Sequence, residues 1–584
     1  MNPKKYLSAI IVCLLILLAA GVIYAPVGNY GYILYDDMSS IYDPFLTQGL
    51  SLDKLGRAFY DPPAHLPYQV PIPTVVRLVL WEMFNDDLGK HHLFSLGMHL
   101  LCALSLFLLL RSMTGRTAAS GFCALLVAVH PLNVEAVSWL AGFNGLLEAF
   151  FLIITLACYG RYVRRPSRPG YLLVFIPFIL GLLSKPTMVI LPLLMVLYDI
   201  WPAGRLGSSV MSIKKSGPDS GRGFVIAEKI PFLMLIPVYL MAGNLIAAGQ
   251  WWRTRTTPFS FHPGAVVDFV RHLGKIIYPV GLTVCRPDPP EAPLAAVMGL
   301  GLAALVISSL LLWKTRNRGY LITGWFWFLI AAAPVAVMLF VSGRPVEDHH
   351  LYIPLIGVFI MMAFGLSDFL APFRHGRGLF LITASVITIA LTAVSFDQVK
   401  HWENSQTIFQ RALSVHPDNK KARVNLGDAC LEKGRIEEAA RHYRRFLEIA
   451  PDSALGHTKL AQSLALLGRP EDARRHLETA LRLSPDYVPA LHGLADLLAG
   501  LGKTDQAIAL YRRALEINTG LFQTHNNLAL ALYDQGHFQE ALAHLDQAIR
   551  LKPDYRTAIE NRRVILYFGD TILNADKLSM VSPD

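Results

Sequence analysis

The sequence predicts an all-α protein in two parts: a polytopic membrane domain of helices, and a soluble stack of helical repeats after it. Two observations predict this fold class. Long apolar stretches fill the first 400 residues, in a chain of 584 residues that is 53% hydrophobic and 16% charged, with a mean hydropathy of +0.40. After residue 400, the same small residues return every 34 positions. The composition excludes a disordered chain and argues against a single soluble globule.

The net charge of +10 belongs entirely to the first 400 residues. They hold 30 of the 53 Lys and Arg residues and 20 of the 43 Asp and Glu residues, which leaves 23 of each sign for the remainder. Because the basic excess coincides with the apolar stretches, we interpret it as membrane-topology charge and expect no nucleic-acid partner. The six cysteines show no CxxC or metal spacing, so neither a disulfide framework nor a zinc site is predicted.

Eleven stretches are apolar enough to span a bilayer core of about 30 Å as helices. They are residues 7–26, 91–111, 118–132, 141–160, 170–183, 186–201, 230–248, 292–313, 320–341, 351–371 and 379–396. The first could be a signal peptide, but its length favours a retained anchor. Counting crossings from a cytoplasmic N-terminus places 18 of the 30 basic residues on short inner segments, in agreement with the positive-inside rule. The odd number of crossings predicts that everything after residue 400 lies outside.

Two long outer loops are predicted within the membrane domain of residues 1–399, at 27–90 and 249–291. The second loop contains an apolar stretch, 264–282, that basic residues interrupt. We interpret this stretch as an interfacial or re-entrant helix. A twelfth span is the alternative, and it would place the C-terminal domain inside.

A C-terminal domain is predicted at 402–568, with four 34-residue repeats at about 419–552, flanking helices on either side, and a tail at 569–584. The recurring residues are Gly434, Gly468, Gly502 and Gly536; Ala439, Ala473, Ala507 and Ala541; and Leu426, Leu460, Leu494 and Leu528. The glycine lets the first helix of each pair end in a left-handed conformation, and the alanine allows the paired helices to approach closely. This is the tetratricopeptide pattern, which predicts a superhelix whose groove binds a protein or peptide; a spacer or a dimer surface is the alternative.

Ionisable residues gather beside the spans at the predicted outer face. They are Asp36 and Asp37 after the first span, His130 and Glu135 at the end of the third, Lys185 between the fifth and sixth, and Arg344, His349 and His350, with Tyr352, between the ninth and tenth. Because charge near apolar spans is costly, such residues usually line a cavity or bind a ligand. A carboxylate can take a proton from an acceptor hydroxyl, and Lys or Arg can stabilise a departing phosphate. Glu148, within the fourth span, is interpreted as bonding a neighbouring helix and not as catalytic.

An ordered set of motifs resembles one known family. The motifs are Tyr35-Asp36-Asp37, Gly89-Lys90-His91-His92-Leu93, His130-Pro131-Leu132-Asn133-Val134-Glu135, Leu183-Ser184-Lys185-Pro186 and Leu351-Tyr352-Ile353-Pro354. With the tetratricopeptide tail, they are similar to bacterial relatives of the transmembrane-and-tetratricopeptide-repeat protein O-mannosyltransferases, which are membrane glycosyltransferases of the GT-C class. The chain departs from the family pattern at Asp348-His349-His350, where these relatives tend to carry Asp-Arg-Tyr.

The resemblance implies an enzyme that moves a mannose-like sugar from a polyprenyl-phosphate carrier to a hydroxyl acceptor, a protein Ser or Thr, on the non-cytoplasmic face. It implies that Asp36 or Asp37 is the catalytic base and that Glu135 and Lys185 lie near the carrier phosphate. We expect His130, Arg344, His349, His350 and Tyr352 to complete the donor-binding set. A divalent cation is conceivable, but no metal-ligand set is assigned.

The expected location is a bacterial inner membrane, with a cytoplasmic N-terminus and periplasmic repeats that recruit the acceptor or a partner. Two other functions remain open. One is a membrane-anchored scaffold whose repeats gather envelope proteins beside an inactive transferase module. The other is a transferase that acts on a lipid or a polysaccharide.

Overall fold

The computed structural model describes residues 3–35, 37, 42–47, 49–60, 70–206, 222–247, 273–287, 293–314, 318–342 and 347–579. Within these residues the regular secondary structure is entirely helical, which confirms the predicted fold class. The chain divides into two compact units, residues 1–417 and 418–584. Helix α20 (Ser405–Val415), which the sequence analysis grouped with the C-terminal domain, falls in the first unit.

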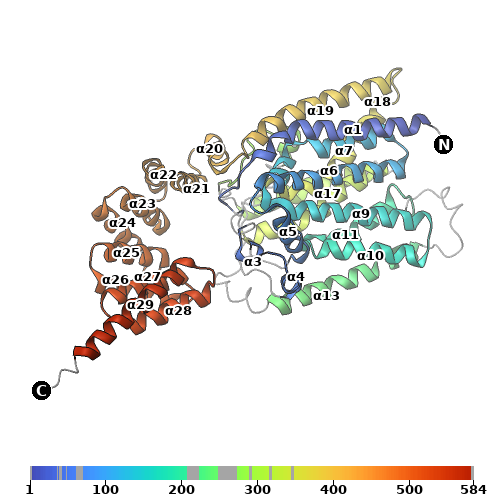
Figure 1. The fold of residues 1–584 in the computed structure, drawn as a ribbon. Helices are drawn as coiled ribbons and strands as arrows, with labels where there is room; N and C mark the ends of the chain where they lie inside the picture. The colour runs from blue at the N-terminus through green and yellow to red at the C-terminus, as the bar shows by residue number, and fades with distance from the viewer. Residues whose placement is uncertain are drawn as a thin grey trace. The chain divides into compact units, whose positions relative to one another are not determined.

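The first unit is a bundle of long helices whose axes run in roughly the same direction (Figure 1). They are α1 (Pro3–Tyr24), α6 (Leu88–Thr114), α7 (Thr117–Val129), α9 (Phe143–Arg164), α10 (Arg168–Leu182), α11 (Leu191–Ile200), α13 (Ile230–Ala247), α16 (Leu294–Lys314), α17 (Gly319–Ser342), α18 (Tyr352–Leu370) and α19 (Gly376–Lys400). Helix α1 packs against α7 and α19, α6 packs against α7 and α9, and α17 packs along α18. Each of the eleven predicted apolar stretches overlaps one of these helices.

Helix length gives fewer membrane spans than the sequence predicts. Among the described residues, seven helices are long and apolar enough to cross a membrane, or eight if α7 is counted together with the short helices after it. Residues 168–182 and 186–200 are apolar but form helices of only 15 residues, about 22 Å long. By this criterion the described residues contain seven or eight spans, so the chain is a multi-pass membrane protein, and the number of eleven spans stays a prediction.

A proline bends the chain at the end of α7. Helices η2 (Pro131–Asn133) and α8 (Val134–Ser138) continue from α7 at an angle of 53°. Pro131 has no amide hydrogen and disfavours a helical conformation at the residue before it, and His130 is accordingly extended, with φ −73° and ψ 131°. Because of the bend, Glu135 lies off the axis of α7. It can therefore contact a distant part of the chain, as described below.

Two glycines set the distance between α17 and α18. A Cβ atom on Gly324 or on Gly357 would overlap the backbone carbonyl oxygen of the other residue. Small residues permit this kind of close approach between helices in a membrane. The contact fixes the position of α17, one face of which forms a wall of the candidate site.

The first predicted outer loop contains short helices where it is described. These are α3 (Pro44–Thr47), α4 (Leu52–Tyr60) and α5 (Pro71–Phe84). Of the second predicted loop, the structure describes residues 273–287, with one helical stretch at 273–277. Most of the stretch 264–282, interpreted from the sequence as an interfacial or re-entrant helix, lies outside the described residues.

A buried charge network joins the far end of α9 to its neighbours. Arg205 Nη1 lies 3.0 Å from Asp199 Oδ1 and 2.6 Å from Glu228 Oε1, and Lys229 Nζ lies 2.7 Å from the same Glu228 oxygen and also pairs with Asp199. The hydroxyl of Tyr159 donates within the network. Only 2% of the Lys229 side chain is exposed. Arg205 and Lys229 therefore hold these helix ends together.

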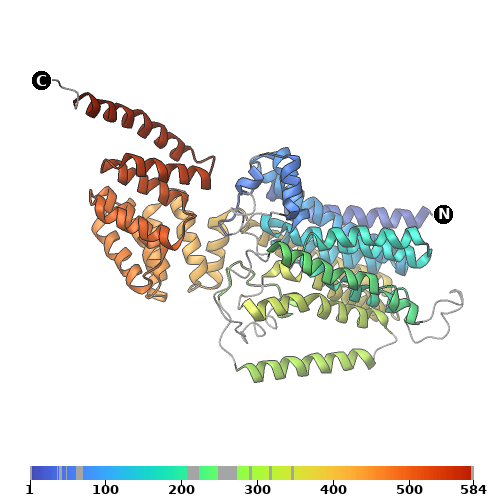
Figure 2. The ribbon, with the colours of Figure 1, turned by 90° about the horizontal axis from the view of Figure 1, so that it is seen from below.

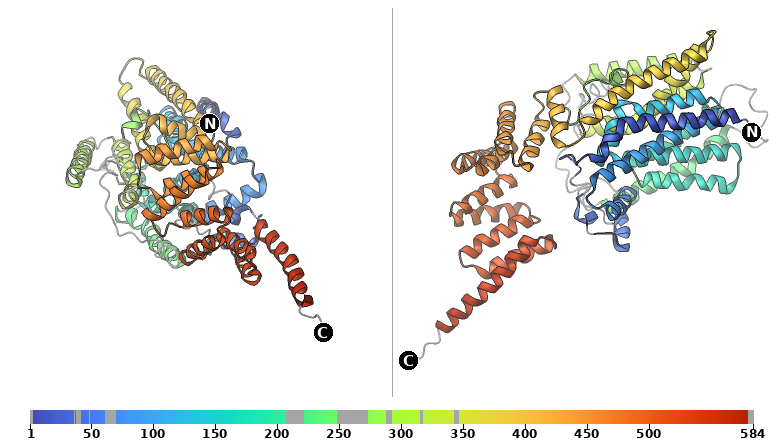
Figure 3. Two further views of the ribbon diagram at one scale, coloured as in Figure 1. Left: turned by 90° about the vertical axis from the view of Figure 1, so that its left-hand side faces the viewer. Right: turned by 45° about the horizontal axis from the view of Figure 1, so that its top comes forward.

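The second unit is a stack of helix pairs, which Figures 2 and 3 show in orange to red. The helices are α21 (Lys420–Glu432), α22 (Ile436–Ile449), α23 (Ala454–Leu466), α24 (Pro470–Leu483), α25 (Val488–Gly500), α26 (Thr504–Ile517), α27 (Phe522–Asp534), α28 (Phe538–Leu551) and α29 (Arg556–Ser579). The recurring glycines have φ between +69° and +81°, and the recurring alanines are fully buried, as the repeat pattern predicts. Helix α29 continues into the stretch 569–584, which the sequence analysis treated as a tail.

Candidate functional site

A cavity of about 440 Å³ lies in the first unit, between α9, α17 and two irregular segments. The irregular segments are η4 (Pro186–Ile190), which follows Lys185, and η6 (Asp348–Leu351), which precedes α18. Four of the residues predicted from the sequence line the cavity, namely Lys185, His349, His350 and Tyr352. They come from parts of the chain more than 160 residues apart, so the fold brings them to one place.

The polar wall of the cavity centres on Glu148 of α9. The Thr187 hydroxyl donates to Glu148 Oε1 at 2.5 Å, and Lys185 Nζ lies 3.8 Å from Glu148 Oε2. Glu148 is buried, whereas the Lys185 side chain is 16% exposed and lines the cavity. The sequence analysis interpreted Glu148 as a bond between helices. It does make such a bond, and in addition it lines the cavity beside the lysine.

Another part of the cavity lining is apolar. It consists of Leu240 of α13 and of four residues on one face of α17, which are Ala331, Pro334, Val335 and Met338. Asn144 and Gly145, at the start of α9, also line the cavity, and Arg77 Nη2 donates to the Asn144 side chain at 3.3 Å. One wall can therefore contact an apolar group while the other contacts an anion.

Glu135 meets η6 beside the cavity. His349 Nδ1 lies 2.6 Å from Glu135 Oε1, and the backbone N–H of His349 donates to the same oxygen at 3.4 Å. Asp348 forms a buried ion pair with Arg286, a residue that the sequence analysis did not single out. Glu135 is 3% exposed and does not itself line the cavity, so the structure places it behind His349.

Asp37 anchors the first outer loop next to the cavity. Its Oδ2 accepts the N–H of Ile33 at 2.9 Å, and its Oδ1 accepts the N–H of Ala141 at 2.9 Å. Ala141 lines the cavity. Asp37 is fully buried, so it joins two segments and lies within a short distance of the cavity wall. Asp36 and Arg344, which the sequence analysis also predicted for the site, lie outside the described residues.

His130 and Tyr352 have hydrogen-bond partners that hold helices together. His130 Nε2 lies 3.0 Å from the carbonyl oxygen of Ile276, and its Nδ1 accepts the N–H of Leu132 at 3.3 Å. The Tyr352 hydroxyl lies 2.7 Å from Nδ1 of His99, a residue of α6 that the sequence analysis did not select. Of these two predicted residues, only Tyr352 also lines the cavity.

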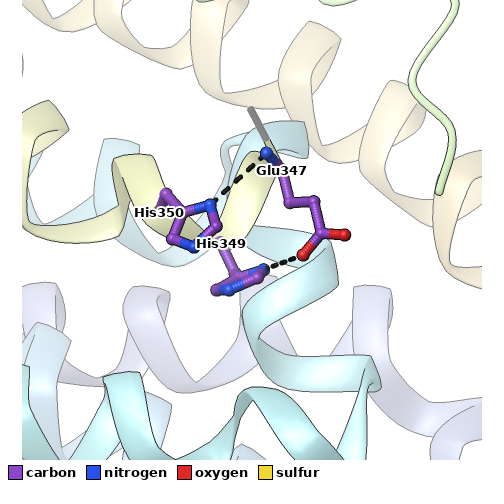
Figure 4. Close-up of side chains that lie close together, drawn as sticks. All are labelled: Glu347, His349 and His350. Atoms are coloured by element: carbon purple, nitrogen blue, oxygen red, sulfur yellow. Dashed lines mark hydrogen bonds and ion pairs between the residues drawn. The ribbon is translucent and has the colours of Figure 1, made fainter. Parts of the chain in front are cut away.

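Glu347, His349 and His350 form a compact group on one short segment (Figure 4). One potential ligand atom from each residue lies within 4.8 Å of the other two. Glu347 Oε2 lies 3.7 Å from His349 Nδ1, and the Glu347 N–H donates to His350 Nδ1 at 3.4 Å. Two imidazoles and a carboxylate are a donor set that several divalent transition ions accept.

The fold and the cavity define the chain as a multi-pass membrane protein with a polar cavity inside the bundle and a tetratricopeptide array after it. Sequence comparison supports both parts. Models described as tetratricopeptide repeat match residues 393–454, 452–520 and 522–555. These matches confirm the repeats predicted from the 34-residue period.

The chain is similar to proteins named protein O-mannosyl-transferase TMTC. It is 24% identical to TMTC4 of Homo sapiens over 363 residues, which covers 56% of this chain and 48% of that protein. It is 22% identical to human TMTC1 over 478 residues, covering 71% of this chain and 52% of the relative, and 22% identical to Tmtc3 of Drosophila melanogaster over 489 residues, covering 70% and 52%. The chain thus spans about half the length of the curated relatives it matches. The resemblance stated from the motifs is confirmed by these homologues.

Proposed function

We propose that the chain is a membrane glycosyltransferase that moves a mannose-like sugar from a polyprenyl-phosphate carrier to a hydroxyl group of a protein. The observation that carries this proposal is the cavity that Lys185 and Glu148 line together with apolar residues of α17. A polyprenyl phosphate has the matching chemistry, an anionic head on an apolar chain. The names of the similar proteins support the same reaction class.

In this reaction the acceptor oxygen attacks the anomeric carbon of the sugar. A bond forms between these two atoms, the bond from the anomeric carbon to the phosphate oxygen breaks, and polyprenyl phosphate leaves as an anion. In-line attack inverts the anomeric centre. The enzyme must therefore stabilise the negative charge on the departing phosphate and remove a proton from the acceptor.

Lys185 is placed to act on the phosphate. Its side chain lines the cavity, and Glu148 and the extended backbone before Pro186 fix its position. His349 and His350 line the same space and can donate hydrogen bonds to phosphate oxygens. In a partly dry cavity, one oriented cation has a much larger effect on a developing anion than it has in water.

The proton goes to a carboxylate of the first outer loop, Asp36 or Asp37. Asp37 lies beside the cavity wall through its bond to the Ala141 N–H. The proposed orientation places this loop outside a bacterial inner membrane, with the repeats periplasmic and their groove recruiting the acceptor protein.

Sugar transfer to protein tests this proposal. Membranes containing the wild-type chain are expected to transfer a radiolabelled sugar from polyprenyl phosphate to the protein fraction. The Asp36→Asn/Asp37→Asn variant is expected to transfer the sugar at least about 100-fold more slowly, because general-base catalysis contributes 10²–10⁴-fold. Expression must be matched by immunoblot.

A second aspartate pair provides the control. Asp87 caps α6 by accepting the N–H of Lys90 at 3.2 Å, and asparagine is an equally good capping residue. The Asp86→Asn/Asp87→Asn variant should therefore transfer sugar at the wild-type rate. Equal transfer by both double variants would exclude the assigned base, and label found only in the lipid fraction would show a lipid acceptor instead.

A further inference from the structure

We propose that Glu347, His349 and His350 bind a divalent transition-metal ion at the edge of the cavity. The three side chains come from a single segment of four residues, and one potential ligand atom of each lies within 4.8 Å of the others (Figure 4). Two imidazole nitrogens and one carboxylate oxygen favour Zn²⁺ or Mn²⁺ over Mg²⁺ or Ca²⁺, which prefer oxygen ligands throughout.

Glu135 provides the support that such a site requires. Its Oε1 lies 2.6 Å from His349 Nδ1 and also accepts the backbone N–H of His349, so Glu135 holds this imidazole in place. A histidine ligand is commonly oriented by a carboxylate in this manner. The arrangement comes from two distant segments, α8 and η6, which the bend at Pro131 allows to meet.

The local charge also favours a cation. Three carboxylates lie at this position, on Glu135, Glu347 and Asp348, and Arg286 pairs directly with Asp348. Lys185 also acts electrostatically on His349, and Lys185 is itself paired with Glu148. Glu347 also caps η6, because its side chain accepts the backbone N–H of His350 while its own N–H donates to His350 Nδ1 at 3.4 Å, so a metal ion would replace contacts within this one segment.

The site opens onto the cavity. His349 and His350 both line it, so an ion held by three protein ligands would present a further coordination position to that space. Metal sites with three protein ligands and one open position are typical of catalytic rather than structural metals. Under the proposed function, on which this role depends, the ion would add positive charge beside the carrier phosphate. Metal binding itself does not depend on the transfer reaction and can be measured without it.

Titration with Co²⁺ tests the site directly. The full chain, purified in detergent with a tag that lacks histidine and stripped with EDTA, is titrated with Co²⁺ and monitored by visible absorption, and Zn²⁺ is then added as a competitor. All samples carry Cys430→Ser, because Cys430, Glu438 and His442 of the repeats also lie within 4.8 Å of one another and could bind the probe. One equivalent of Co²⁺ is expected to bind and to be displaced by Zn²⁺.

Matched variants assign the ligands. Glu347→Gln and His350→Asn are each expected to weaken Co²⁺ binding at least about tenfold, whereas His537→Gln, at an exposed position of the repeats, should bind as the parent does. Thermal unfolding of each variant without metal checks that it is folded. The proposal is overturned if the parent shows no Zn²⁺-sensitive Co²⁺ band, or if folded Glu347→Gln and His350→Asn variants both bind Co²⁺ with the parent affinity.

Discussion

Replacing Lys185 by methionine is expected to lower sugar transfer at least about 100-fold. Methionine keeps most of the length of the lysine stem but removes the charge that would face the carrier phosphate. Removal of one donor that stabilises a developing anion typically costs 10²–10³-fold in rate. The measurement is the initial rate of transfer from a radiolabelled polyprenyl-phosphate sugar, at saturating donor and equal amounts of enzyme.

A second substitution separates this role from a structural one. In Lys185→Met, Glu148 would be left in the bundle without its cation, which could itself disturb the fold. The double variant Glu148→Gln/Lys185→Met removes both charges, and the amide oxygen of the introduced glutamine can still accept the bond from the Thr187 hydroxyl. If Lys185 serves only to neutralise Glu148, the double variant should recover transfer. We expect it to recover stability and to remain inactive.

Replacing Lys229 by methionine is expected to destabilise the chain by about 3–5 kcal/mol, the usual cost of breaking a buried ion pair from one side. Lys229 pairs with Asp199 and Glu228, and Asp199 is fully buried. Without the lysine, Arg205 alone would balance two carboxylates. Thermal unfolding of the purified protein should show a decrease in Tm of at least about 5 °C.

Two controls define the cause of this loss. The double variant Asp199→Asn/Lys229→Met removes one charge of each sign and should recover much of the lost Tm. Lys400→Met removes a cation that is 54% exposed and lies 3.9 Å from Asp397, and it should leave Tm unchanged because exposed ion pairs contribute little. A Tm of Lys229→Met equal to that of Lys400→Met would refute the role assigned to the buried network.

Local pattern alone predicted most of the fold. Apolar stretches of suitable length identified all the long helices, because burial in a bilayer requires little more than composition and length. The repeats were predicted from Gly434 and Ala439 and their equivalents, since a positive φ and a close helix contact each restrict the residue type strictly.

The candidate site was predicted only in part. Lys185, His349 and His350 were selected because charged or titratable groups beside apolar spans are costly and usually line a cavity or bind a ligand. The structure places these three residues around one cavity. Glu148 was set aside, because nothing in its own neighbourhood reveals that Lys185 and Thr187 reach it from another helix. Arg286 was missed for the same reason, since its partner Asp348 lies 62 residues further along the chain.

Turnover of a defined donor by the purified chain tests the central claim most directly. The wild-type protein, reconstituted in liposomes with synthetic polyprenyl phosphates carrying labelled mannose, glucose or N-acetylglucosamine, is incubated with a periplasmic protein fraction. We predict that one donor loses its sugar to protein, that polyprenyl phosphate appears in equal amount, and that Lys185→Met abolishes both. Failure to transfer from every donor, or transfer that is the same with Lys185→Met, would contradict the account.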